Sequence, residues 1–304
     1  MRPTAILRAL AADVGPRTYR GLREVANQQT IRRALAAGDL TRLVADQYCL
    51  TLHAESWIMR SRAAVEWAGP GAALTGAAAL AAYRYAPLPI DLIQVAVPAG
   101  GHKTGPRWIR VRSLTMPFTT ATWTPKTQLT GTPLAMLLGY GTITPRRRAS
   151  FLHGAIHEGI VTGKEVNDLA RTLTRIPAKQ ELQRRLEYIA AGAESYLEER
   201  GMANIFFGPE CDEVVFQHRV RVRGQSFRID AFHPPSMTAF ELDGDSTHDE
   251  QPDRKRDLRR DALLATIGMA TVRFARESVL EVPEWCRGVV LETMASRTNR
   301  WWSA

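Results

Sequence analysis

Residues 227–244 read FRIDAFHPPSMTAFELDG, and this stretch decides the fold of the carboxy-terminal part of the chain. Apolar and polar residues alternate along 227–232 and again along 237–245, which is typical of half-buried β-strands. Between the two runs, the His-Pro-Pro-Ser sequence at 233–236 favours a turn. The stretch therefore predicts two neighbouring strands joined by a tight connection.

Further elements are predicted outward from this pair. They are a helix over residues 178–200 that ends at Gly201, a strand over 214–224, a basic helix over 252–267 that ends at Gly268, and a strand over 270–274. The order helix, three-strand meander, helix, strand predicts a mixed sheet that is flanked by helices.

Three carboxylates are expected to gather on this sheet. Alternation places Asp230 on the strand face opposite Ile229 and Ala231, and it places Glu241 and Asp243 together on one face of the next strand. Like charges that face each other across a sheet are destabilising and raise one another's pKa. A bound Mg²⁺ or Mn²⁺ compensates such charges, and it can activate water and stabilise the charge that builds on a phosphodiester. The alternative is a solvated acidic edge without metal.

Two other residues are candidates for the same catalytic chemistry. Glu181, early in the first of these helices, is either an additional metal ligand or an exposed helix charge paired with Arg184 or Arg185. His248 follows the turn after Asp243, where it either shuttles a proton and orients water or is a loop histidine without a task.

Arginines on either side of the carboxylates predict contacts with a nucleic-acid backbone. The candidates are Arg219, Arg221 and Arg223 on the preceding strand and Arg256 and Arg260 on the basic helix. For the helix pair, the alternative is a salt-bridged surface formed with the aspartates of the same helix.

The first 55 residues have the outline of a winged helix-turn-helix. Three short helices are predicted over residues 4–12, 18–26 and 28–37, followed by a β-ribbon that turns near Ala45-Asp46. The third helix would enter the major groove of DNA. Its outward candidates for DNA contact are Gln29, Arg32 and Arg33. A plain three-helix cap with a solvated polar face is the alternative.

Residues 56–176 predict an α/β middle domain without a chemical constellation. The expected elements are two Ala-rich helices over 56–86, strands at 93–98 and 108–114, a helix that opens at Thr132-Pro133, and helices near 146–158 and 163–173. The boundary to the last domain, residues 177–304, is expected at Ile176-Pro177. The fold class is therefore α/β or α+β, with a mixed central sheet in the last domain.

The charge is distributed unevenly along the chain. Of 40 Lys and Arg and 31 Asp and Glu in 304 residues, residues 1–176 hold 22 basic and 10 acidic ones, a balance of +12. Residues 177–304 hold 18 basic and 21 acidic ones, a balance of −3. A strongly basic part favours nucleic acid as the partner. We expect the first 176 residues to hold DNA and the remainder to concentrate carboxylates.

The cysteines and the first residues indicate a cytoplasmic protein without a membrane anchor. Cys49, Cys211 and Cys286 lie far apart and have no zinc-ligand spacing, which fits a reducing compartment. The opening MRPTAILRALAADVG lacks the apolar core of a signal peptide.

The stretch from Glu181 to Phe274 resembles the very-short-patch-repair-like endonuclease domain (domain of unknown function 559) of the PD-(D/E)XK superfamily. The matching pieces are E-L-Q-R-R-L from residue 181, F-R-I-D from 227, F-E-L-D-G from 240, His248, D-L-R-R-D-A-L-L from 257 and G-M-A-T-V-R-F from 268. The resemblance implies Asp230, Glu241 and Asp243 as metal ligands and Glu181 as the helix acid. Asp243 stands where the superfamily usually has lysine, and Met269 replaces the usual tryptophan.

Residues 18–173 resemble the AbiEi-like antitoxin proteins of type IV toxin–antitoxin systems. The resemblance rests on the winged-helix outline and on L-T-G-A-A-A-L-A-A-Y from residue 74, I-Q-V-A-V-P from 93 and T-P-L-A-M-L-L from 132. It implies DNA binding and a role in phage defence.

These features predict a metal-dependent DNA endonuclease or nickase, acting in phage defence or DNA repair. The alternative is a DNA-binding, antitoxin-type transcriptional regulator whose nuclease fold is inactive. A weaker third possibility is a scaffold that pairs with a separate effector. DNA is the expected partner, no membrane is expected, and a homodimer and a cognate toxin or effector remain open as partners.

Overall fold

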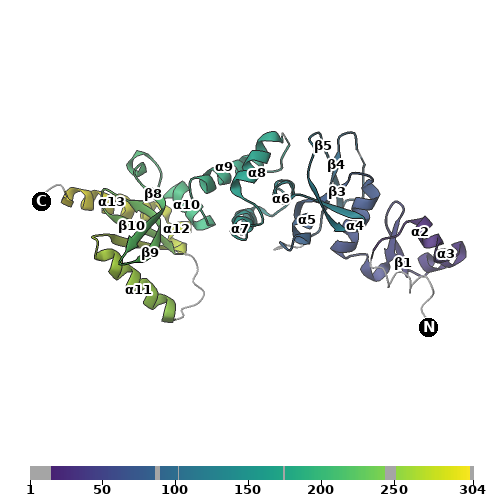
Figure 1. Ribbon diagram of the computed structural model, residues 1–304, viewed down its shortest axis with the longest axis horizontal. Coiled ribbons are helices and arrows are strands. Elements are labelled where there is room, and N and C mark those ends of the chain that lie inside the picture. The colour runs from purple at the N-terminus through teal and green to yellow at the C-terminus, as the bar shows by residue number, and fades with distance from the viewer. Residues whose placement is uncertain (1–14, 86–89, 102, 174, 244–250, 302–304) are drawn as a thin grey trace. The chain divides into compact units, whose positions relative to one another are not determined.

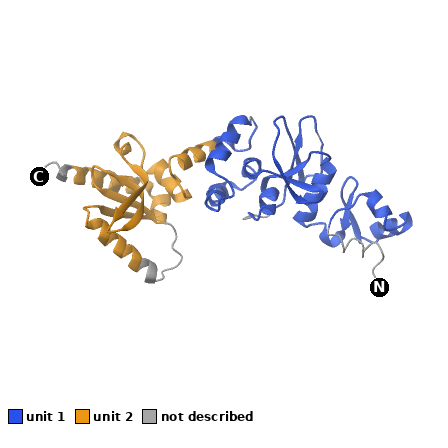
Figure 2. Cartoon of the chain, in the orientation of Figure 1, with its two compact units in different colours: residues 1–180 blue, residues 181–304 orange. Residues whose placement is uncertain are grey.

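The computed structural model describes residues 15–85, 90–101, 103–173, 175–243 and 251–301 (Figure 1). Contacts divide the chain into two compact units, residues 1–180 and residues 181–304 (Figure 2). The division lies close to the expected boundary after Ile176. Residues 1–55 and 56–176, expected as separate domains, fall together within the first unit.

Unit 1 contains two sheets and seven α-helices among its described residues. In chain order the elements are α2 (Tyr19–Arg23), α3 (Gln28–Ala36), β1 (Leu40–Val44), β2 (Gln47–Leu50), the 3-10 helix η1 (Thr51–His53), α4 (Trp57–Ala68), β3 (Ala73–Thr75), α5 (Gly76–Ala82), β4 (Ile93–Pro98), β5 (Ile109–Leu114), β6 (Thr120–Thr124), β7 (Thr127–Thr130), α6 (Thr132–Tyr140), α7 (Pro145–His157) and α8 (Gly163–Thr172). Strands β1 and β2 pair antiparallel, and the other five form a mixed sheet in the order β5-β4-β3-β7-β6.

Two of the three predicted amino-terminal helices and the predicted β-ribbon are present. The side chain of Asn27 accepts a hydrogen bond from the Thr30 N–H and so begins α3, whose Ile31 and Ala34 are buried. Strands β1 and β2 turn at Asp46, which has a φ of 56°. Helix α2 ends at Arg23 and is shorter than expected, and the predicted helix over residues 4–12 lies outside the described residues.

In the middle region, the predicted helices and the two predicted strands are present. Strands β3, β6 and β7 were not predicted. Strand β3 has only three residues, and β6 is a Thr-rich strand whose side chains are mostly exposed. Strand β3 is too short for alternation to show, and the alternating residues of β6 do not mark a buried face.

Unit 2 has one four-stranded sheet, covered by helices on both faces. Helix α9 begins in the last residues of unit 1 and continues into unit 2. The elements are then α9 (Lys179–Ala190), α10 (Tyr196–Asn204), the 3-10 helix η2 (Pro209–Cys211), β8 (Val215–Val222), β9 (Gln225–His233), β10 (Thr238–Asp243), α11 (Gln251–Ala265), β11 (Ala270–Ala275), α12 (Arg276–Glu281) and α13 (Pro283–Trp301). The strand order is β11-β10-β9-β8. Strands β8, β9 and β10 form the predicted antiparallel meander, and β11 joins β10 in parallel.

The long helix predicted over residues 178–200 is wrong, because the chain forms two helices there. Helix α9 ends at Ala190, and Gly192 follows with a φ of 112°, a backbone conformation that favours glycine. Ser195 then caps α10 by accepting a hydrogen bond from the Glu198 N–H at 3.2 Å. Helix α10 also continues past the predicted end at Gly201, where a Cβ atom would lie 2.4 Å from a methyl carbon of Leu242.

The regular alternation expected for β9 is interrupted at Asp230. Ala231 packs in the cluster formed with α10, α12 and α13, whereas Ile229 packs in the cluster under α11. Directly across on β8, Gln217 has a φ of 52°, so both strands change faces at this position. The expectation that Ile229 and Ala231 share a face is therefore wrong, and Asp230 lies at a break in the sheet.

The described residues contain no helix that is long and apolar enough to cross a membrane. The three cysteines Cys49, Cys211 and Cys286 are buried and free.

Candidate metal centre

Asp230 and Glu241 meet where the pairing of β9 with β10 ends. The register pairs Thr238 with His233 and Phe240 with Ala231, so one further step would place Glu241 opposite Asp230. The ladder stops before that step. The Asp230 carboxylate instead accepts a hydrogen bond from the Leu242 N–H at 3.0 Å. The two predicted carboxylates are thus neighbours at the break between the strands.

Glu241 is a buried acid in a repulsive environment. Its side chain belongs to the core of unit 2, with a relative exposure of 4% for the residue. Burial raises the pKa of Glu241 to about 8, and the charge of Asp230 adds to this rise. The guanidinium groups of Arg260 and Arg273 act in the opposite direction without cancelling it. Burial also raises the pKa of Asp230, against the Leu242 N–H that lowers it.

The helix acid that reaches Asp230 is Glu198, which the sequence reading did not select. Burial raises the pKa of Glu198, and the charge of Asp230 raises it further. Its carboxylate accepts hydrogen bonds from the Glu194 N–H at 2.8 Å, the Ser195 hydroxyl at 2.9 Å and the Gln217 amide at 2.7 Å. Ser195 and Glu198 have the Ser-x-x-Glu spacing typical of a helix start, and this signal could have found the residue.

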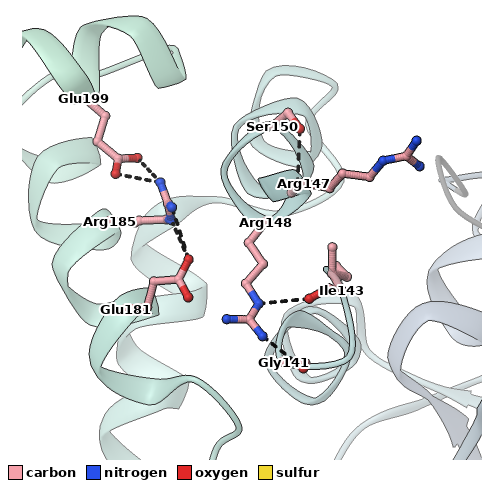
Figure 3. A network of polar contacts seen from close by, with 8 residues as sticks. All are labelled: Gly141, Ile143, Arg147, Arg148, Ser150, Glu181, Arg185 and Glu199. Carbon is pink, nitrogen blue, oxygen red and sulfur yellow. Dashed lines mark hydrogen bonds and ion pairs between the residues drawn. The ribbon is translucent and has the colours of Figure 1, made fainter. Parts of the chain in front are cut away.

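The predicted helix acid, Glu181, takes part in a different network. It forms an ion pair with Arg185 at 3.1 Å, which was the alternative expected from the sequence. One guanidinium nitrogen of Arg185 also donates to both carboxylate oxygens of Glu199, at 2.6 and 2.7 Å (Figure 3). Figure 3 shows Arg185 between these two carboxylates. Glu181 therefore stabilises the packing of α9 against α10 through Arg185.

Gln217 is a second residue that the sequence did not reveal. Its amide nitrogen donates to Glu198, while its amide oxygen is buried and has no hydrogen-bond partner among the described residues. A buried amide oxygen without a partner costs free energy and is a natural ligand for a cation or its bound water. Its unusual backbone conformation aims this side chain at the carboxylates.

Arginines hold two of the three predicted metal ligands. Glu241 forms an ion pair with Arg260, and Asp243 forms one with Arg273 at 3.1 Å. Arg273 also contacts Asp261 at 3.0 Å. Within the described ranges, no group of three or more His, Cys, Asp or Glu side chains is arranged to hold a metal ion. His248 lies outside the described residues.

The donor set nevertheless suits a hard divalent cation in its chemistry. The charge of Asp230 raises the pKa of both Glu198 and Glu241, so the three carboxyl groups lie within electrostatic reach through Asp230, and Gln217 adds an unpartnered oxygen. For Glu241 to become a ligand, Arg260 has to release it. Asp230 and Glu198 have no ion pair of this kind with an arginine among the described contacts.

The predicted nucleic-acid contacts divide into two groups. Exposed ones are Gln29, Arg32 and Arg33 on α3, Arg219 and Arg221 on β8, Arg223 in the following turn, and Arg256 on α11. Arg260 is instead turned toward the carboxylates, where it also donates to the Arg228 carbonyl at 2.7 Å. On the hairpin, Arg219 lies directly opposite Arg228, so two like charges are paired on its surface.

Comparisons with known proteins add little to this geometry. No protein-family model and no curated protein gives a significant match. Among solved structures, the chain is similar to the RV2827C protein from Mycobacterium tuberculosis, with 14% sequence identity and a TM-score of 0.41. That likeness covers 66% of this chain and 79% of the other. At this level of similarity, it assigns neither a family nor a function to the chain.

Proposed function

We propose that the protein is a metal-dependent DNA endonuclease or nickase, with its hydrolytic centre in unit 2. The observation that carries the proposal is the meeting of Asp230 and Glu241 at the break between β9 and β10. Natural sheets avoid two acids in adjacent register positions, and the cost is greater where burial limits solvation, as it does fully for Glu241 and partly for Asp230. Their presence is explained if they bind a cation during function.

Each residue of the centre has a distinct task in this proposal. Asp230 and Glu241 hold Mg²⁺ or Mn²⁺, which supplies an activated water and neutralises charge on the phosphodiester. Glu198, supported by Gln217, supplies a further oxygen on the α10 side or orients the water. Asp243, held by Arg273, keeps that arginine beside Glu241 and is a secondary ligand at most.

Unit 1 is proposed to bind duplex DNA through α3. Support comes from the exposed Gln29, Arg32 and Arg33 on a helix whose opposite side packs in the core, and from the basic balance of the first 176 residues. The three free, buried cysteines fit a reducing cytoplasm as the proposed location.

One observation favours a second candidate function, a DNA-binding regulator with an inactive nuclease fold. Glu241 and Asp243 are already neutralised by Arg260 and Arg273. In an inactive domain such ion pairs are permanent, and no cation competes for the carboxylates.

A plasmid assay separates the two functions. Purified full-length protein is incubated with supercoiled plasmid in EDTA, in Mg²⁺ and in Mn²⁺. The nuclease proposal expects nicked or linear product only with the divalent cations. Uncut plasmid, linear duplex and single strands under all three conditions support the regulator.

A further inference from the structure

A groove separates β9 from α11 on the side of the sheet that carries Arg260. Its walls include Phe227 from β9 and Lys255, Arg259 and Leu263 from α11, and Arg260 forms the wall nearest the carboxylates. The groove measures about 730 Å³. Sites for small ligands typically measure roughly 300–1,000 Å³, so a group the size of a nucleotide fits.

Besides Arg256 and Arg260, two further cations line the groove and face solvent. Lys255 and Arg259 are exposed, and neither makes a hydrogen bond or an ion pair with another residue that the structure describes. They lie four positions apart on α11, so their side chains project from the same face of the helix. Two adjacent cations that repel each other favour an anion between them. A phosphate is negatively charged, and its oxygens accept hydrogen bonds from lysine and arginine N–H groups.

The groove also has an apolar part, formed by Phe227 of β9 and Leu263 of α11. Phe227 packs against the cluster of Val222, Ile229 and Leu264 with part of its side chain, and the rest lines the groove near Leu263. Proteins bind unpaired nucleotides with an aromatic ring beside cations. The base stacks on the ring, and the cations contact the negatively charged phosphate. In a duplex the faces of the bases are stacked on one another and are not available to such a ring.

We propose that this groove holds one unpaired nucleotide of the substrate strand, with its base on Phe227 and Leu263 and its phosphate on Lys255 and Arg259. Because Arg260 both lines the groove and contacts Glu241, this nucleotide lies next to the carboxylates. The substrate of the proposed nuclease is then a strand that is single-stranded at this point, such as a flap, bubble or displaced strand. The inference rests on the proposed function only in taking nucleic acid as the ligand.

Photo-crosslinking tests the location without relying on cleavage. The full-length protein is irradiated in EDTA with a single-stranded oligonucleotide that carries one 5-iododeoxyuridine, and trypsin then releases Gly224–Arg228, the peptide that contains Phe227. We expect the crosslink on this peptide. We expect its yield to fall several-fold in the double variant Lys255→Ala, Arg259→Ala, and to stay unchanged in Arg184→Ala, an exposed arginine on α9 of the same unit.

Three results would overturn the proposal. One is crosslinks that map elsewhere in the chain, or none at all. Another is an equal yield on this peptide from a fully paired duplex, because the base would then not need to be unpaired. The third is an equal yield from iododeoxyuridine monophosphate at the same concentration, which would make the groove a site for free nucleotides. Since divalent ions are absent, a protein that never cleaves DNA can still give the expected crosslink.

Discussion

The guanidinium group of Arg260 on α11 forms an ion pair with the buried carboxylate of Glu241 on β10. It also donates to the Arg228 carbonyl on β9, so one side chain connects the helix with both strands at the candidate centre. In the proposed function, a divalent cation would compete with Arg260 for the same carboxylate. Metal binding would then depend on the position of this arginine.

Replacing Arg260 should strengthen metal binding. We expect Arg260→Gln to bind Mg²⁺ about tenfold more tightly at pH 8.5, because the cation no longer displaces a charge-assisted hydrogen bond worth roughly 1.5–3 kcal/mol. Isothermal titration of the DNA-free protein measures the affinity. Arg259→Gln is the matched control, since its side chain lines the groove and should change the affinity less. Equal changes in both variants would mean that only overall charge matters.

The raised pKa of Glu241 makes stability depend on pH. A carboxyl whose pKa is about 8 in the folded state, against an ordinary value of 4.5, contributes stability that is complete below pH 4.5 and lost as the pH rises through about 8. Glu241→Gln removes this loss. In EDTA, we expect the free energy of unfolding of the variant to increase relative to that of the wild type between pH 5 and pH 9. The scale is ~1.4 kcal/mol for each unit by which folding raises the pKa of Glu241.

Chemical denaturation at several pH values measures that gain. Glu187→Gln, an exposed glutamate on α9, is the control and should follow the wild type at every pH. A Glu241 variant whose free energy of unfolding falls relative to the wild type as the pH rises would contradict a raised pKa for Glu241.

Glu198 and Glu181 give a matched pair of helix-acid variants. We expect Glu198→Gln to lower the cleavage rate by on the order of a hundredfold, since its charge reaches Asp230. Glu181→Gln should leave the cleavage rate unchanged and reduce the free energy of unfolding by about 1 kcal/mol, because it loses its ion pair with Arg185. If Glu181→Gln lowered the cleavage rate and Glu198→Gln did not, Glu181 would be the helix acid of the centre.

The parts of the fold that the sequence predicted are those with local signals. Alternation and the turn at 233–236 specified β9 and β10 and therefore brought Asp230 close to Glu241. The break after Ala190 was not predictable, because Ile189, Ala193 and Leu197 keep helical spacing across it. A glycine can adopt the φ of 112° found at Gly192, but its presence in the sequence does not establish that it will do so.

The choice of partners within the site is likewise not a local property. The sequence placed Arg260 among the phosphate contacts, and the structure turns it toward Glu241. That pairing depends on how α11 packs against the sheet through Leu264, which spacing along the chain does not encode. Gln217 was missed for the same reason, since only the pairing of β8 with β9 reveals its position opposite Asp230.

DNA affinity should depend on α3. We expect Arg32→Ala and Arg33→Ala each to weaken binding of the full-length protein to duplex DNA and to reduce the slope of log affinity against log salt by about 1. Fluorescence anisotropy across a salt series measures both quantities. Arg184→Ala is the control outside the proposed interface. An unchanged slope in the α3 variants would remove this helix from the DNA-binding surface.

The carboxylates of the candidate centre provide the decisive test of the proposed chemistry. We expect Asp230→Asn and Glu241→Gln each to lower divalent-dependent cleavage by at least about a thousandfold, because losing one oxygen ligand both weakens the ion and misplaces the attacking water. DNA binding should persist, since it comes from basic residues elsewhere. In the wild type, Mg²⁺ should also raise the melting temperature, increasingly as its concentration exceeds the dissociation constant, and both variants should lose this gain. A wild-type protein whose melting temperature does not respond to Mg²⁺ or Mn²⁺, and which cuts no DNA, would instead make the ion pairs of Glu241 and Asp243 the permanent state of an inactive fold.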